Sequence, residues 1–161
     1  MSTIFGGSMS SRLFQNIREK EGISYSIYSF HSSYSDNGIF GIYCATSPDT
    51  CLKALGLIYA ECQKVLNHDI TSEELEDTRT FLAGNLALSL ESVEVRMGQL
   101  AKNEISLGLS YTFEDIVDKI NGISLDDIYR VSDKLFKDNQ LSMISIGNIS
   151  EKKLRDFNYK F

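Results

Sequence analysis

The sequence has few of the residues from which self-sufficient active sites are built. It has two histidines, His31 and His68, three cysteines and no tryptophan. His31 is followed by Ser-Ser-Tyr-Ser and His68 by Asp-Ile-Thr-Ser, so neither lies in an H-x-x-E-H or H-E-x-x-H motif. Because a catalytic zinc ion needs about three protein ligands, we predict no metal site in this chain. We expect His31 on a strand surface and His68 in a loop.

Motifs for other chemistries are also missing. No G-x-S-x-G sequence is present, so a nucleophilic serine of that type is excluded. Gly38 and Gly41 do not stand between a strand and a helix, as a dinucleotide-binding loop requires. The carboxylates fall on predicted helix faces and helix starts, where solvation and capping explain them. The sequence therefore predicts no complete active site.

Positive charge and long apolar runs are scarce. Sixteen lysines and arginines face 22 aspartates and glutamates, and the net charge of −6 disfavours binding to nucleic acid. No apolar run approaches the roughly 20 residues that span a bilayer, and the first residues lack the pattern of a secretory signal. A longer parent protein could still carry such a signal.

The cysteines favour a reducing compartment. Cys51 and Cys62 share one predicted helix, about 16 Å apart, which is too far for a disulfide. We read these two and Cys44 as reduced thiols and expect a cytoplasmic location.

Alternating helix and strand signals predict one α+β domain over residues 1–161. Met9, Leu13 and Ile17 are spaced as the buried face of a helix over 8–21, with Gly22 placed as its C-terminal cap. Strands are predicted over 23–32, 39–46 and 141–147, the first two joined by a turn at 35–38. Further helices are predicted over 47–66, 71–92, 93–107, 113–121 and 124–135.

One run identifies a family. Residues 6–29 read GGSMSSRLFQNIREKEGISYSIYS. This string resembles the C-terminal region of pitrilysin/insulinase-type peptidases, the inverted zincins that include the mitochondrial processing peptidases. The likeness continues in matching order through Asp36-Asn37-Gly38, the Thr71-to-Leu75 helix start, Leu82-to-Leu86, Glu91-Ser92 and Gly147.

The resemblance implies a two-layer sandwich in which an antiparallel sheet packs on helices. In that family, zinc is held by an H-x-x-E-H motif in the N-terminal half, and the C-terminal half closes over the peptide. An arginine and a tyrosine seven residues apart assist from the C-terminal half, and Arg18 and Tyr25 match that pair. The residues alone also permit a solvated Arg18 at a helix end and a packed Tyr25. Arg12 is expected to form a structural salt bridge, and Gly6-Gly7 to permit a tight backbone turn.

The family domain normally begins with a strand and a helix ahead of the glycine pair, and here only residues 1–5 precede it. We therefore expect a domain lacking its first strand, and self-association by edge-strand pairing or swapping. The expected partners are a zinc-bearing N-terminal domain or subunit and a peptide substrate.

The leading hypothesis is the substrate-binding, transition-state-assisting half of a zinc metalloendopeptidase, inactive alone. The alternative keeps the fold but assigns a structural or assisting role, as in processing-peptidase or respiratory core subunits. A third possibility is an unrelated α+β interaction module in which the motif is accidental.

Overall fold

The computed structural model describes residues 1–136 and 141–157 and divides into two compact units. The first unit comprises residues 1–70 together with the chain from Ile128 onward, and the second comprises residues 71–127. The first unit combines a β-hairpin with helices, and the second is helical. The chain is thus α+β, as predicted, whereas the single domain over 1–161 stays a prediction.

The first unit is built on a two-stranded antiparallel hairpin, β1 (Ser24–Ser33) and β2 (Gly38–Thr46). The predicted turn closes it, and the Tyr34 N–H donates to the Asn37 carbonyl at 2.8 Å. Both strands are rich in β-branched and aromatic residues, which favour a pleated, half-buried surface. This hairpin agrees with the prediction to within one residue at each strand end.

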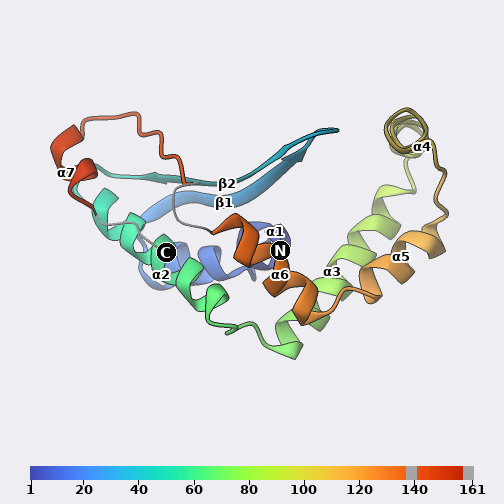
Figure 1. Cartoon of the computed structure of the whole chain (residues 1–161), viewed down its shortest axis with the longest axis horizontal. Helices are drawn as coiled ribbons and strands as arrows, with labels where there is room; N and C mark the ends of the chain where they lie inside the picture. Colours follow the sequence, from blue (N-terminus) through green and yellow to red (C-terminus); the bar gives the residue numbers. More distant parts are fainter. Residues whose placement is uncertain (137–140, 158–161) are drawn as a thin grey trace. The chain divides into compact units, whose positions relative to one another are not determined.

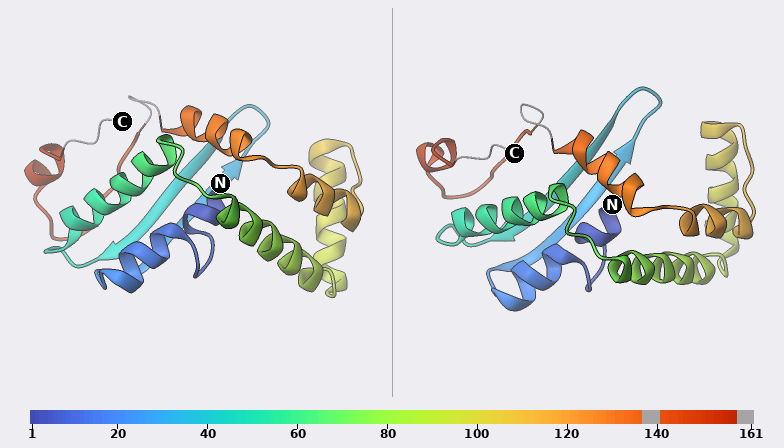
Figure 2. Two further views of the ribbon diagram at one scale, coloured as in Figure 1. Left: turned by 90° about the horizontal axis from the view of Figure 1, so that it is seen from below. Right: turned by 60° about the horizontal axis from the view of Figure 1, so that its bottom comes forward.

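Helices cover one face of the hairpin, which gives the predicted two layers (Figures 1 and 2). The helical segments of this unit are α1 (Ser2–Gly6), the π-helix η1 (Phe14–Lys20), α2 (Cys51–Leu66), most of α6 (Leu125–Leu135), and α7 (Glu151–Arg155). Of these, α1 and η1 pack on β1, and α2 packs on η1 and β2.

The core between the layers is aromatic. Phe5, Phe40 and Phe136 form a triangle with ring centroids 5.9–6.1 Å apart. Leu13 and Ile17 are also fully buried, as the helix spacing predicts. Burying such side chains stabilises a fold by about 1.5–3 kcal/mol each. The three rings come from distant parts of the sequence, so this cluster holds the first unit together.

The second unit consists of α3 (Ser72–Ser89), α4 (Val93–Leu107) and α5 (Phe113–Asn121), and α3 packs against α5 (Figure 2). Its helix ends follow local signals. The Thr71 and Thr112 side chains accept hydrogen bonds in capping boxes, and Gly108 ends α4 at φ +62°. These helices begin and end close to where the sequence predicts.

Four predictions about the chain's elements are wrong. The helix predicted over 47–66 begins only at Cys51, so Ser47 does not cap it. Residues 141–147 form no strand, and Ile144 and Ile146 are 90% and 97% exposed. A strand exists only with a hydrogen-bonded neighbour, which sequence alternation alone does not provide. The first predicted helix begins after Ser11, leaving Met9 75% exposed, and Val131 of α6 is exposed rather than inward. None of the described helices is long and apolar enough to cross a membrane.

Candidate functional site

Arg18 lies in the last turn of η1 and points into solvent. Its side chain is 44% exposed, and its Nε lies 4.0 Å from the Glu19 carboxylate, a weak ion pair. The guanidinium carbon lies over the Phe14 ring, 4.7 Å from the ring centroid. The π-helical form of η1 was not visible in the sequence, because its apolar spacing also fits an α-helix. Arg18 thus presents a permanent charge at the protein surface while resting on an aromatic ring.

Tyr25 follows on β1, after the predicted left-handed cap at Gly22, which has φ +63°. It sits at a bulge, because β1 pairs Ser24 with Thr46 and Ser26 with Ala45, leaving Tyr25 without a partner residue. A bulge redirects a side chain out of the regular pleat, and Tyr25 is 91% exposed. The packed position that the residues alone also permitted is therefore wrong, since Tyr25 lies on the surface. The bulge itself carries no sequence signal that we recognise.

A recess of about 280 Å³ opens beside Tyr25. It is lined by uncharged residues from the start of β1 and from the turn leading into α2: Gly22, Ile23, Ser24, Tyr25, Ser47 and Thr50. Hydroxyl groups around it bond to one another. The Thr50 hydroxyl lies 2.6 Å from that of Thr46 and 2.8 Å from that of Ser47, and Ser24 donates to the Ala45 carbonyl at 2.9 Å. The recess is therefore a fixed, neutral, polar surface next to the Tyr25 ring.

Aromatic side chains continue along the hairpin from Tyr25. Tyr28 and Tyr43 stack with centroids 5.0 Å apart, and both are nearly half exposed. The Phe30 ring lies over Gly41, where an added Cβ would meet ring atoms at 2.3–2.8 Å. Between Gly22 and Ser35 the chain carries no Asp, Glu, Lys or Arg. This stretch therefore presents a neutral aromatic surface, which the sequence analysis did not single out.

The segment before Arg18 is fixed by close packing. An added Cβ at Gly6 would meet the Ser29 backbone nitrogen at 2.4 Å, so α1 approaches β1 more closely than any other residue allows. Arg12 pairs with Asp69, with 3.6 Å between Nη1 and Oδ2, and also donates to the Asp69 carbonyl. The structural salt bridge predicted for Arg12 is confirmed, and Asp69 is the carboxylate.

A buried carboxylate holds η1 to α2. The Glu61 side chain is 5% exposed, and its Oε1 accepts from Asn16 Nδ2 at 2.9 Å and from Lys64 Nζ at 2.7 Å. Its other oxygen, Oε2, is buried and has no hydrogen-bond partner among the described residues. The predicted buried stripe of this helix contained only apolar residues and did not include Glu61.

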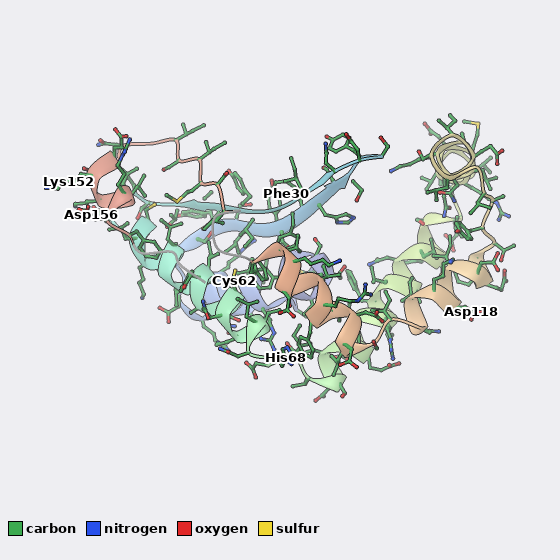
Figure 3. The ribbon with its side chains drawn as sticks, viewed as in Figure 1. Phe30, Cys62, His68, Asp118, Lys152 and Asp156 are labelled. Atoms are coloured by element: carbon green, nitrogen blue, oxygen red, sulfur yellow. The ribbon has the colours of Figure 1, made fainter. Side chains whose placement is uncertain are left out.

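No metal site is formed by the described residues, since no three His, Cys, Asp or Glu side chains lie together in them. His31 is exposed on β1, as predicted. His68, labelled in Figure 3, lies in the loop after α2 at φ +60°. Its ring stacks on that of Tyr129, with 4.0 Å between centroids. The donor set therefore does not fit zinc. Cys44, Cys51 and Cys62 are free thiols, and burial raises the pKa of Cys62 to about 12.

These features define an α+β domain with two exposed hydrogen-bond donors, Arg18 and Tyr25, and no metal centre of its own among the described residues. Residues 1–82 match the peptidase M16 inactive domain family. The chain belongs to this family and is a C-terminal domain of the pitrilysin type.

Individual relatives support this family assignment. The uncharacterized zinc protease YmxG of Bacillus subtilis is 42% identical over 129 residues, which is 80% of this chain and 31% of YmxG. A peptidase M16 inactive domain from Pseudomonas fluorescens matches with a TM-score of 0.72 and 26% identity, over 83% of this chain and 32% of that one.

A chain in complex III2 from Candida albicans matches with a TM-score of 0.70 and 20% identity, over 83% of this chain and 34% of that one. At that identity, the likeness shows the fold alone. The chain spans about a third of the length of these relatives.

Proposed function

We propose that this chain is the substrate-binding, transition-state-assisting part of a zinc metalloendopeptidase and is inactive alone. The observation that carries the proposal is the run 6–29, in which Arg18 and Tyr25 match the family's assisting pair and both side chains reach solvent. The neutral recess and the aromatic surface beside Tyr25 are suited to an uncharged peptide backbone.

Arg18 and Tyr25 would contribute to catalysis by donating hydrogen bonds. Peptide cleavage passes through a tetrahedral species with negative charge on the former carbonyl oxygen, and one fixed donor to that oxygen is worth about 2.7–4 kcal/mol. The Tyr25 O–H can donate to this oxygen, and the Arg18 guanidinium can donate two parallel bonds to substrate carbonyls. Zinc would be held by another part of the parent protein and would supply the activated water there.

Point variants in the full-length parent test this assignment. Arg18→Gln and Tyr25→Phe should each lower kcat by about 100-fold while zinc content stays unchanged, because neither residue binds metal. Arg155→Gln and Tyr34→Phe are matched controls, since Arg155 forms an exposed ion pair with Glu151 and Tyr34 is 65% exposed at the hairpin turn. Unchanged turnover in both test variants, or loss of zinc, would refute the proposal.

The isolated chain gives a second test. It should bind no stoichiometric zinc and cleave no peptide, because the described residues offer no ligand cluster. Peptide cleavage by the purified chain that a chelator abolishes would contradict this expectation.

The alternative function is a structural or assisting subunit with the same fold. The likeness to a chain of complex III2 supports it at the level of fold. The rest of the parent sequence decides between the two: an intact H-x-x-E-H motif supports the peptidase, and degraded ligands support the structural subunit.

The hairpin also supports self-association. Within the described residues no third strand pairs with β1 or β2, and the apolar segment 141–146 is exposed. Unpaired strand edges are templates for pairing with another chain. We propose that the isolated chain forms a homodimer by edge pairing or strand exchange. Light scattering that shows a monomer at tens of micromolar would rule this out.

A further inference from the structure

The helix that carries Arg18 is of an uncommon kind. All seven residues of η1, Phe14–Lys20, are π-helical. Such segments are rare, mostly single turns, and often occur at functional sites. In η1 the side chains at positions 14 and 18 lie together, so that the Phe14 ring supports the Arg18 guanidinium at 4.7 Å. The Arg18 side chain remains 44% exposed to solvent beside this ring.

A second contact fixes the rotation of η1 about its axis. Asn16 lies between two partners: its Nδ2 donates to Glu61 Oε1 at 2.9 Å, and its Oδ1 accepts from Lys20 Nζ at 2.9 Å. Lys64 holds Glu61 from the side of α2 at 2.7 Å. The chain of contacts Lys20–Asn16–Glu61–Lys64 therefore joins η1 to α2 by directional bonds.

Packing alone does not account for Glu61. Leu13 and Ile17 already bury the inner side of this segment completely. A buried carboxylate is costly, and here its Oε2 has no hydrogen-bond partner within residues 1–136 and 141–157. An apolar residue of similar size would often be as stable or more stable. A carboxylate can accept a directional hydrogen bond from Asn16, and an apolar residue cannot.

We propose that Phe14 and the Asn16–Glu61 pair are positioning residues that hold the Arg18 guanidinium in the orientation needed to bind a peptide carbonyl. Phe14 sets the plane of the guanidinium, and Asn16–Glu61 sets the rotation of the helix that carries it. This inference rests on the function proposed for Arg18. It adds three residues that contact no substrate themselves.

The orientation of Arg18 is measured directly in the isolated chain by NMR. The Nε–H group of Arg18 should show a ring-current shift and restricted motion, and Phe14→Leu should abolish both while the fold is kept. Phe81→Leu, at an exposed aromatic on α3, is the control and should change neither. A mobile Arg18 Nε–H in the unaltered chain, or no change in Phe14→Leu, would overturn the proposal.

Kinetics in the full-length parent test the consequence. Phe14→Leu should lower kcat/KM about two- to fivefold, the worth of an exposed cation–π contact. Glu61→Ala should lower it about tenfold through misplacement of Arg18. Glu61→Gln keeps an acceptor for Asn16 and Lys64 and should stay within about twofold of the unaltered protein. Because Glu61→Ala could impair folding, Asn16→Ala provides a second break of the same contact.

A double-mutant cycle separates positioning from stability. In an Arg18→Gln background, Phe14→Leu and Asn16→Ala should have no further effect on kcat/KM, because the group they orient is gone. Effects that add fully to that of Arg18→Gln would refute the positioning role. If Arg18→Gln itself leaves turnover unchanged, the proposed function fails, while the NMR measurement still decides whether Phe14 orients Arg18.

Discussion

Replacing Gly6 by alanine should destabilise the first unit through a single misplaced methyl group. The new Cβ would lie 2.4 Å from the Ser29 backbone nitrogen, 2.9 Å from the Tyr28 carbonyl carbon and 3.0 Å from Ser29 Oγ. Two of these are backbone atoms, which cannot rotate away, so α1 must move off β1. Overpacking of this kind costs about 1–3 kcal/mol.

A glycine-to-alanine substitution at Gly56 should have the opposite effect on stability. Gly56 lies inside α2, in the same unit, and an added Cβ there meets nothing within 4 Å. Glycine in a helix interior is about 0.5–1 kcal/mol less favourable than alanine, so Gly56→Ala should stabilise by that amount. The two variants differ in position only, which makes Gly56→Ala a matched control for the steric effect.

Urea unfolding followed by circular dichroism measures both. With a slope of about 2 kcal/mol per molar urea, Gly6→Ala should lower the midpoint by about 0.5–1.5 M and Gly56→Ala should raise it by about 0.25–0.5 M. A Gly6→Ala variant as stable as the unaltered chain would show that the close approach of α1 to β1 is not required, and would refute the reasoning.

Two further predictions concern the first unit. Because burial raises the pKa of the Cys62 thiol to about 12, alkylation of Cys62 in the folded chain at pH 8 should be about 1000-fold slower than in urea. The raised pKa also makes stability depend on pH, because above about pH 9 the thiol ionises in the unfolded chain before it does in the folded one. The contribution of Cys62 to the stability of the folded state is therefore present up to about pH 9 and is lost between pH 9 and 12. Urea midpoints that rise over this interval would contradict the prediction. The Tyr129 hydroxyl accepts from the Ile70 N–H at 3.2 Å and lies 2.9 Å from the Ile70 carbonyl, so Tyr129→Phe should cost about 1–3 kcal/mol in the same assay. Tyr34→Phe, at an exposed position, should leave the midpoint unchanged.

Features with local causes were predictable. The capping box at Thr71, the left-handed cap at Gly22 and the hairpin turn each depend on residues a few positions apart, and the structure has all of them. The helix over 113–121 has its predicted bounds for the same reason. Local hydrogen bonds decide these features, and their sequence signatures are short.

Features with distant causes were not predictable. The strand over 141–147 is absent because strand formation needs a neighbour, and alternation identifies none. Met9 shares the spacing of Leu13 and Ile17, yet it is exposed, because the helix begins after it. Glu61 is buried although the apolar pattern of its helix does not include it, because Asn16, 45 positions earlier, donates a hydrogen bond to its carboxylate.

The sequence by itself determined the family, the α+β class and the lack of a zinc motif, because each is carried by residue identities and short spacings. It also singled out Arg18 and Tyr25. Only the tertiary structure decided how these two are presented: a π-helix with Phe14 beneath Arg18, a bulge that turns Tyr25 into solvent, and a carboxylate buried behind the helix. Their physical reason is contact between segments that meet only after folding, where backbone approach and directional hydrogen bonds select one conformation among several that the local sequence allows.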